Sequence, residues 1–547
     1  MVLRKTALGA AAVIAVAALA LAGCSGSPKG QTSGPSELTL DLNHLAATTP
    51  TGTTPVDQVK WNLPYEPSLI DPIFTWNYAE NTVTANMCES LVRLKPDLSQ
   101  EPGLASKVEQ PDDTTVIYTI REGVTFWDGN PLTAEDVAFS LQRQIGPDTK
   151  SYWADYFHNV ASAEATGPLQ VTVKLSKPDV LFTQAMGSAA GAIVEKAAVE
   201  AGGQAFGTPK GGLQCTGPYK LGAWDSGKSL TMDRNDAYWD SSVKPKVKQI
   251  SFSFIADEST AINALRTGDV DGQFFYLPPA GLSQLQKSSN VTTTFGKSFV
   301  FWTLAAINKD GAMGDEKIRQ ALSLAIDRTA LTKVVFQGAG IPAPTLAGPD
   351  MWGYGKDQFS SAYKKFGVAP DLEKAKKLVE EAGSPKTPIV LAVQGSSAVH
   401  EQTASVIQAA GQAIGLNVQT KVIPVEQFGN LYFDQTARKG LDGFFTTNYG
   451  DFADPLNVYS FFQSGNSHDY IGWDSADADI AKALQTSDDT ARAKLVVGIQ
   501  DKVTQGLPWI PLAYEPTTLI QNKRISGAVP SFAYLYSPWA VTIGGTK

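Results

Sequence analysis

Hydrophobic and polar residues alternate in several short stretches of the chain, a pattern typical of β-strands with one buried face. In the first stretch, Val116, Tyr118 and Ile120 fall on the same side of an extended chain. We therefore predict three strands, over residues 114–120, 171–175 and 249–254.

In other segments the apolar residues recur every three or four positions, which indicates amphipathic helices. One helix is expected to begin after Asp371, whose side chain suits an N-cap, and to end at Gly383. A longer helix is expected over residues 315–336, and another over residues 403–414 with a strand over 416–423 behind it. Because helices and strands mix along most of the chain, we predict an α/β fold.

The first 23 residues have the pattern of an export signal. Arg4 and Lys5 precede an uncharged run that ends in small residues directly before Cys24. A cysteine at this place resembles the cleavage site of bacterial lipoproteins, where it carries a diacylglycerol, and two acyl chains give a stable anchor. We therefore expect residues 1–23 to be a signal peptide and the lipidated Cys24 to hold the protein on the outside of the cytoplasmic membrane. The alternative is an N-terminal membrane anchor in which Cys24 has no part.

Composition limits what the rest of the chain can be. Of the 547 residues, 43% are hydrophobic and 18% are charged, as in a globular protein too long for one ordinary core. Acidic residues outnumber basic residues by 54 to 45, which gives a net charge of −9, so we expect no binding to nucleic acid. Residues 24–57 are rich in Gly, Ser, Thr and Pro, and we expect a flexible tether after the lipidated cysteine.

Two further cysteines, Cys88 and Cys215, remain to be placed. In an oxidising compartment such a pair can form a disulfide, but the sequence does not give the distance between the two residues. A disulfide and two separate buried thiols are therefore both open.

Catalytic and metal-binding motifs are missing from the sequence. The four histidines are scattered, and His400-Glu401 lacks the second histidine of a zincin motif. Neither a G-x-S-x-G elbow nor a P-loop is present. We therefore expect a binding protein that is not an enzyme and that has no metal and no cofactor.

Several segments of the chain form one recognisable series of motifs. The most distinctive is YTIREGVTFWDG at residues 118–129, followed by LTAEDV at residues 132–137. Further motifs lie at residues 67–72, 88–91, 215–219, 234–239, 264–271, 318–328 and 508–512. In content and order these segments resemble one family, the extracellular solute-binding proteins of family 5, which bind peptides for bacterial ABC importers. Single residues in these segments also have structural explanations, such as Asp136 as a helix cap and Arg319 in a surface pair.

The resemblance implies a two-lobed, hinged fold of the type II periplasmic-binding-protein kind, in which the larger lobe carries an extra subdomain. Lobe I would comprise residues 58–96, an inserted subdomain over 97–206, residues 207–302 and a return over 506–547. Lobe II would comprise residues 303–505. The two crossings, near 299–302 and 509–514, would act as the hinge, and the importer would read the closed form.

The resemblance also suggests where a ligand would bind. Residues 448–455 resemble a family segment in which an acidic residue precedes an aromatic residue and an acidic-Pro step. By this match Asp451 would receive the α-ammonium group of a peptide, and Gly450 would hydrogen-bond its backbone. The further candidates for lining the site are Asn448, Tyr449, Glu89 and Trp302. The alternative is that Asp451 only caps a turn.

One departure from the family bears on the cargo. Dipeptide binders hold the ligand's carboxylate with an arginine before the helix that corresponds to residues 403–414, whereas residues 393–399 contain neither Arg nor Lys. Because a buried unpaired carboxylate is costly, an oligopeptide is favoured over a dipeptide. The implied protein is a monomer that delivers peptides to an ABC permease and its ATPase subunits. Two other interpretations stay open: a non-peptide cargo such as an oligosaccharide, metal chelate or opine-like molecule, and an enzyme or signalling lipoprotein on the same scaffold.

Overall fold

The structure is a computed structural model that describes residues 40–146, 149–274 and 279–547. Cys24 and the predicted signal peptide lie outside these residues, so lipidation stays a prediction. Within the described ranges, no helix has both the length and the apolar composition needed to cross a membrane.

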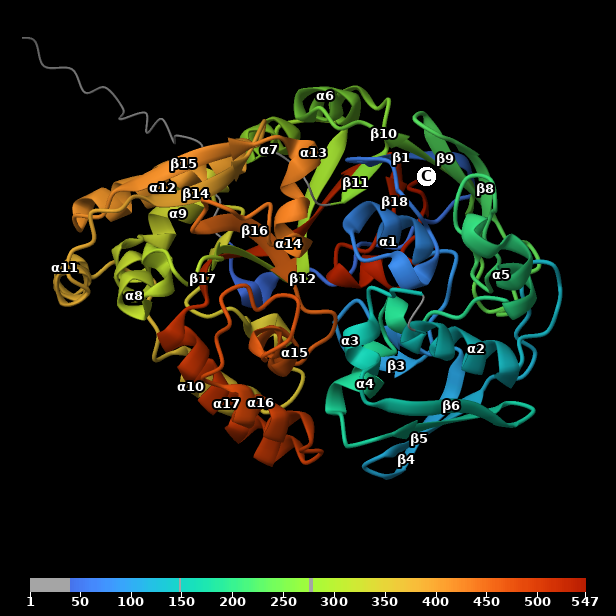
Figure 1. The fold of residues 1–547 in the computed structure, drawn as a ribbon. Helices are drawn as coiled ribbons and strands as arrows, with labels where there is room; N and C mark the ends of the chain where they lie inside the picture. Colours follow the sequence, from blue (N-terminus) through green and yellow to red (C-terminus); the bar gives the residue numbers. More distant parts are fainter. Residues whose placement is uncertain (1–39, 147–148, 275–278) are drawn as a thin grey trace, which may run out of the picture. The chain divides into compact units, whose positions relative to one another are not determined.

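The main sheet has eleven strands and mixes parallel with antiparallel pairs (Figure 1). Across the sheet the order is β15 (Val418–Ile423), β14 (Ile389–Gln394), β16 (Gly443–Tyr449), β12 (Val291–Ala306), β17 (Trp509–Asn522), β11 (Gly272–Phe274), β1 (Val56–Leu63), β10 (Val247–Phe254), β9 (Ser229–Arg234) and β8 (Tyr219–Asp225), with β13 (Ile341–Pro342) paired to β17. The strand β17 is antiparallel to both of its neighbours, β12 and β11. β12 spans the predicted boundary between the lobes at residues 302 and 303, and β17 connects it to the remaining strands of predicted lobe I.

The long strands β12 and β17 carry the segments predicted as crossings between lobes. Their pairing register shifts between Gly296 and Val300 and again between Trp302 and Thr303. Such irregularities bend a strand and increase its twist. The first register shift overlaps the start of the predicted crossing at residues 299–302, and the second lies at its end. That this crossing acts as a hinge stays a prediction.

A separate four-stranded antiparallel sheet lies within the predicted inserted subdomain. Its order is β4 (Ala105–Asp112), β5 (Thr115–Ile120), β7 (Gln170–Leu175) and β6 (Val160–Gly167). Val116, Tyr118 and Ile120 are buried, which confirms the predicted face of β5. The helix α2 (Ala134–Ile145) packs on β6 and β7 (Figure 1), and it begins with a capping box formed by Thr133 and Asp136.

Helices cover the sheets along the chain (Figure 1). Their bounds are α1 (Tyr78–Thr84), α3 (Ala154–Phe157), α4 (Val180–Ala185), α5 (Lys196–Gly202), α6 (Glu258–Thr267), α7 (Pro279–Gln286), α8 (Glu316–Ala325), α9 (Arg328–Val335), α10 (Lys356–Tyr363), α11 (Leu372–Glu381), α12 (Ala398–Ala413), α13 (Val425–Phe428), α14 (Asn430–Phe433), α15 (Pro455–Tyr459), α16 (Asp477–Leu484) and α17 (Asp489–Gly506). Two short pairs complete the strands, β2 (Val92–Leu94) with β3 (Gln100–Pro102) and β18 (Ile525–Ser526) with β19 (Gly544–Gly545).

The predicted helix after Asp371 is confirmed. The Asp371 side chain accepts a hydrogen bond from the backbone N–H of Lys374, and Gly383 has the positive φ that ends such a helix. The single long helix predicted over residues 315–336 is wrong. The chain is extended at Ile326, and Asp327 caps a new helix by accepting from the N–H of Ala330. A short polar side chain that can serve as an N-cap thus interrupts an otherwise continuous apolar stripe.

Arg319 does not pair on the surface as expected. It is buried, and its guanidinium donates to the backbone carbonyls of Met313, Gly314 and Gly506, at 2.8 Å each. Because three carbonyls are within its reach, the cation is satisfied without a carboxylate partner. It joins the start of α8 to the end of α17.

Part of the segment predicted as a flexible tether packs on the folded chain. The backbone of Ala46 exchanges hydrogen bonds with Phe295 and Lys297, and the N–H groups of Gly52 and Thr53 donate to carbonyls near the C-terminus. These bonds hold residues 46–53 beside β12 and the C-terminal residues. Within the described part of the tether, the backbone is therefore attached rather than free.

Cys88 and Cys215 form a disulfide, which resolves the question that the sequence left open. Their Cα atoms are 5.0 Å apart across a sequence separation of 127 residues. Both cysteines are buried. The bridge ties the end of α1 to the segment before β8, so it closes a long loop that contains the entire four-stranded sheet.

Candidate functional site

A cavity of about 910 Å³ lies between residues of the predicted inserted subdomain and residues of predicted lobe II. Three of the predicted site residues line it: Asn448, Tyr449 and Asp451. Aromatic side chains make up much of the wall on both sides, namely Phe74, Trp76, Tyr152, Tyr156, Phe433, Tyr449 and Phe461. The cavity is partly open to solvent and combines these aromatic side chains with many polar ones, and a concave site of this size can hold a small molecule.

Asp451 follows the end of β16 and is held by hydroxyl groups from two distant parts of the chain. One carboxylate oxygen accepts from the Tyr156 hydroxyl at 2.5 Å, and the other accepts from the Tyr536 hydroxyl at 2.6 Å. Its backbone N–H donates to Asn457 Oδ1 at 2.7 Å, and the Asn457 side chain in turn donates to the Tyr156 hydroxyl. The carboxylate is thus fixed in position, while each oxygen keeps a further lone pair for a ligand.

The Asp451 carboxylate has no cationic partner among the described residues. It is only 7% exposed, and burial raises its pKa to about 6, although the two tyrosine hydrogen bonds act in the opposite direction. Burial and the charge of Asp451 also raise the pKa of both Tyr156 and Tyr536, so these tyrosines remain neutral donors. A buried carboxylate that lines a cavity and has no ion-pair partner among the described residues is suited to bind a cationic group.

The neighbouring residues of the predicted site have different surroundings. The Tyr449 hydroxyl donates to the backbone carbonyl of Trp76, and its ring packs against Phe532 at 5.2 Å between centroids. Asn448 Oδ1 accepts from the N–H of Tyr449 at 2.7 Å. Gly450 is buried and does not line the cavity, and a Cβ atom at this residue would lie 3.0 Å from Asn457 Oδ1. The hydrogen bond expected between its backbone and a ligand stays a prediction.

Glu89 and Trp302 lie outside the lining of this cavity. Glu89 is 4% exposed and accepts from Arg93, Thr216, Tyr238 and Trp239 at 2.7–3.2 Å, so its carboxylate is saturated by the protein. Trp302 is 3% exposed; its indole donates to Thr403 Oγ1 at 3.2 Å and its ring packs against Phe445. Contact of either side chain with a ligand therefore stays a prediction.

Tyr156 and Tyr536, the two residues that hold Asp451, were not predicted from the sequence. Each lies in a segment dense in aromatic residues, at 152–157 and at 532–539. Such clusters are a signal for a binding wall, but buried cores contain them as well. Only the fold shows that the two hydroxyls meet at one carboxylate.

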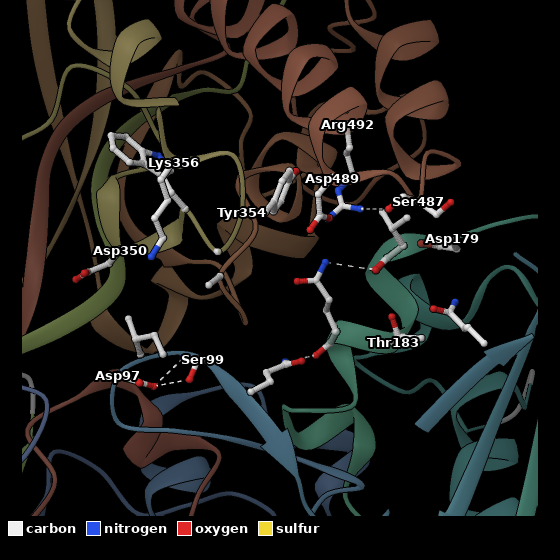
Figure 2. Close-up of a pocket in the computed structure, with 18 of the residues that line it drawn as sticks. Asp97, Ser99, Asp179, Thr183, Asp350, Tyr354, Lys356, Ser487, Asp489 and Arg492 are labelled. Atoms are coloured by element: carbon white, nitrogen blue, oxygen red, sulfur yellow. Dashed lines mark hydrogen bonds and ion pairs between the residues drawn. The ribbon is translucent and has the colours of Figure 1, made fainter. Parts of the chain in front are cut away.

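A second cavity of about 500 Å³ is mostly polar, and Asp179 lines both cavities (Figure 2). Figure 2 shows Asp97, Ser99 and Thr183 on one side of it, with Tyr354, Lys356 and Arg492 on the other. Next to it, the buried Asp454 accepts from Gln184 and Tyr354 at 2.9 Å each and lies 3.6 Å from the Arg492 guanidinium. Gln184 therefore bonds α4 directly to the segment that carries Asp451.

No cluster of three or more His, Cys, Asp or Glu side chains suited to a metal ion occurs in the described part of the chain. The cations that line the larger cavity are Lys150 and Lys177, both exposed and both from the predicted inserted subdomain. Asp155 and Asp179 line the cavity as well, so it presents three carboxyl groups and two lysine ammonium groups to a ligand.

The chain is similar to known proteins over nearly all of its length. A family model described as Bacterial extracellular solute-binding proteins, family 5 Middle, matches residues 99–469. The oligopeptide-binding protein OppA of Bacillus subtilis (strain 168) is 26% identical over 502 residues, which cover 86% of this chain and 89% of OppA.

Two solved structures show the same fold. The binding protein AgaA from A. tumefaciens R10, in complex with agropinic acid, is 23% identical with a TM-score of 0.76 and covers 89% of this chain and 98% of its own. AppA from Bacillus subtilis, in complex with a nonapeptide, is 20% identical with a TM-score of 0.75 and covers 90% of this chain and 100% of its own. The predicted two-lobed α/β fold of the type II periplasmic-binding-protein kind is confirmed.

Proposed function

The chain belongs to family 5 of the bacterial extracellular solute-binding proteins of ABC importers, and from this premise we propose that its cargo is a peptide, an oligopeptide rather than a dipeptide. In this proposal the protein captures peptides between its lobes and delivers them to a permease powered by ATPase subunits. It acts by binding and release, without catalytic chemistry.

The observation that carries the proposal is the state of Asp451. A carboxylate that is 7% exposed, held by two neutral hydroxyls and without a cation, is an incomplete ion pair. An α-ammonium group completes it with charge-assisted hydrogen bonds. Because Tyr156 and Tyr536 fix both oxygens, the ammonium position is fixed as well, and this orients the peptide from its N-terminus.

The preference for an oligopeptide rests on where the cations lie. Residues 393–399 contain neither Arg nor Lys and do not line the cavity. The carboxylate of a short buried ligand would therefore lack the partner that this segment supplies in dipeptide binders. Lys150 and Lys177 are exposed lining residues, so they suit the carboxylate of a peptide long enough to reach the edge of the cavity.

A non-peptide cargo is the second candidate, and one observation favours it. AgaA, with the same fold, was solved with agropinic acid, so the scaffold accommodates a ligand other than a peptide. Aromatic walls also stack well on flat or ring-shaped ligands. This alternative predicts a ligand that binds without a free amine.

We also propose that Cys24 is lipidated and that it anchors the protein on the outside of the membrane. The supporting observation is the sequence before Cys24, with its basic start and small residues. A Cys24→Ala variant is expected to leave the membrane fraction, while the wild-type chain stays there. Equal membrane retention of both would contradict this proposal.

The decisive experiment identifies the cargo directly. The full chain, extracted in a mild detergent, is analysed by native mass spectrometry, and any ligand released on denaturation is sequenced. We expect peptides with free amino termini, and we expect the same peptides to bind at least about 100-fold more weakly once they are N-acetylated, since the ion pair with Asp451 is lost. A released sugar or chelate, or equal binding of acetylated peptides, would overturn the proposed cargo.

A further inference from the structure

We propose that Trp76, Tyr152 and Phe433 form a side-chain subsite of the cavity, and that the preferred peptide carries an aromatic residue at its first or second position. This inference rests on the proposed peptide cargo. The subsite would give the protein a preference among peptide side chains, which hydrogen bonds to the peptide backbone alone do not provide.

The three rings form one connected group that lines the cavity. Trp76 stacks on Tyr152 with ring centroids 5.5 Å apart and an angle of 20° between the planes. Phe433 meets Trp76 edge to face, at 5.9 Å and 81°. Trp76 and Tyr152 belong to predicted lobe I, whereas Phe433 ends α14 in predicted lobe II, so a ligand between the lobes contacts rings from both.

Phe433 is unusually exposed for an aromatic residue in a well-packed chain. Its exposed fraction is 61%, whereas most of the other large aromatic side chains in the core are almost fully buried. Val422 and Val425, nearby in sequence, are also exposed, but neither lines the cavity. An apolar ring left exposed at the edge of a ligand cavity gains stability when a ligand covers it.

The ring group is continuous with the proposed ammonium position. Tyr449, two residues before Asp451, donates its hydroxyl hydrogen bond to the backbone carbonyl of Trp76. Burial and, to a smaller extent, the charge of Asp451 raise the pKa of the Tyr152 hydroxyl, and Tyr152 and Asp451 line the same cavity. The subsite therefore begins beside the group that receives the peptide N-terminus.

Peptide geometry then selects the first two positions. An extended peptide advances about 3.3 Å per residue and its side chains alternate in direction, so only residues next to the ammonium reach a wall next to Asp451. Edge-to-face and offset contacts favour an aromatic side chain over an aliphatic one of similar area. A wall of three rings is thus better matched by Phe, Tyr or Trp than by Leu.

The experiment compares tetrapeptides by isothermal titration calorimetry on the full chain in mild detergent. The ligands are tetra-alanine and three peptides in which Phe replaces alanine at position 1, 2 or 4. We expect Phe at position 1 or 2 to bind about tenfold more tightly than tetra-alanine, because ring burial and ring pairing add to affinity. Phe at position 4 is expected to raise the affinity over that of tetra-alanine by less than about threefold, since its side chain lies beyond the ring group.

Two substitutions connect this preference to the residues. Phe433→Ala removes a largely exposed side chain, so the fold is retained, and we expect the ratio of Phe-peptide affinity to tetra-alanine affinity to fall to about threefold or less in this variant. Val422→Ala is the matched control, an exposed apolar residue outside the cavity that leaves the tenfold preference intact. Trp76→Leu changes the part of the subsite that belongs to predicted lobe I, and we expect it to reduce the preference for Phe as well.

The outcomes separate this inference from the function on which it rests. If all four peptides bind equally tightly, or if Phe433→Ala leaves the preference intact, the subsite is wrong and peptide binding stands. Two additional tetrapeptides carry Lys at position 1 or 2; if either binds more tightly than the corresponding Phe peptide, the rings select a cation and the inference is overturned. If no tetrapeptide binds, the peptide cargo is wrong and the inference falls with it.

Discussion

Asp451→Asn is expected to weaken ligand binding and to stabilise the ligand-free protein at the same time. Asn keeps the size of the side chain and can still accept a hydrogen bond from a tyrosine hydroxyl, but it has no charge. Burial raises the pKa of Asp451 from its usual 3.8 to about 6. The charged form is therefore disfavoured in the folded, ligand-free state.

The size of the stability effect follows from this pKa. At roughly 1.4 kcal/mol for each pH unit, a rise to about 6 means that ionisation of Asp451 costs about 3 kcal/mol of stability above pH 6. The sign is fixed by proton binding, because between pH 3.8 and 6 the folded state holds the proton and the unfolded state does not. Stability is thus lost as the pH rises through 6, and the Asn variant escapes the loss.

The assays are thermal unfolding and peptide titration at pH 4.5 and pH 7.5. At pH 7.5 the variant should unfold at a higher temperature than the wild type, and the difference should shrink at pH 4.5. Peptide affinity at pH 7.5 should fall by about 2–5 kcal/mol, since a buried ammonium loses its counter-charge.

Asp350→Asn is the matched control, because the side chain of Asp350 is also largely shielded and its pKa is also raised by burial, but it is paired with Lys297 at 3.2 Å and lies outside the larger cavity. We expect it to bind peptide as the wild type does. The argument is refuted if Asp451→Asn binds peptide with wild-type affinity, or if it is less stable than the wild type at pH 7.5.

Three further predictions concern other parts of the molecule. Replacing Cys88 and Cys215 with Ser should cost about 2–5 kcal/mol and lower the unfolding temperature, since the disulfide closes a loop of 127 residues; an unchanged temperature would contradict the bridge. Arg319→Met should cost about 2–4 kcal/mol in denaturant unfolding, because two buried carbonyls and one half-buried carbonyl lose their donor, whereas Arg266→Met on the exposed face of α6 should cost less than about 0.5 kcal/mol. If Lys150 and Lys177 receive the peptide carboxylate, C-terminal amidation should weaken wild-type binding by about threefold to tenfold, and the double Gln variant should bind acid and amide equally; identical binding of both forms by the wild type would remove this role.

The sequence predicted those features that depend on local pattern or on a family motif. Alternation identified β5 with its buried face, and the polar residue before an apolar stripe identified the start of α11. The motif at residues 448–455 identified Asp451, which lines the cavity. Each of these features can be predicted from residues that are close together in the sequence.

The rest depended on contacts between distant residues. Tyr156 and Tyr536 lie 295 and 85 residues from Asp451, and nothing in their own segments names that partner. Arg319 was assigned to the surface because a cation suggests a carboxylate, whereas its actual partners are backbone carbonyls, which every sequence contains. The break between α8 and α9 was missed because the apolar spacing continues through Asp327, where a local side-chain cap outweighs it.

The place of β17 in the main sheet sets the order in which the protein can be completed. A chain is made from its N-terminus, yet this strand, close to the C-terminus, supplies the pairing between β12 and β11. Until it arrives, the two halves of the sheet have unpaired edges facing each other, and Asp451 lacks Tyr536. A chain shortened before Tyr536 would lack one of the two hydroxyls that hold Asp451, so under the proposed function it would bind cargo less well.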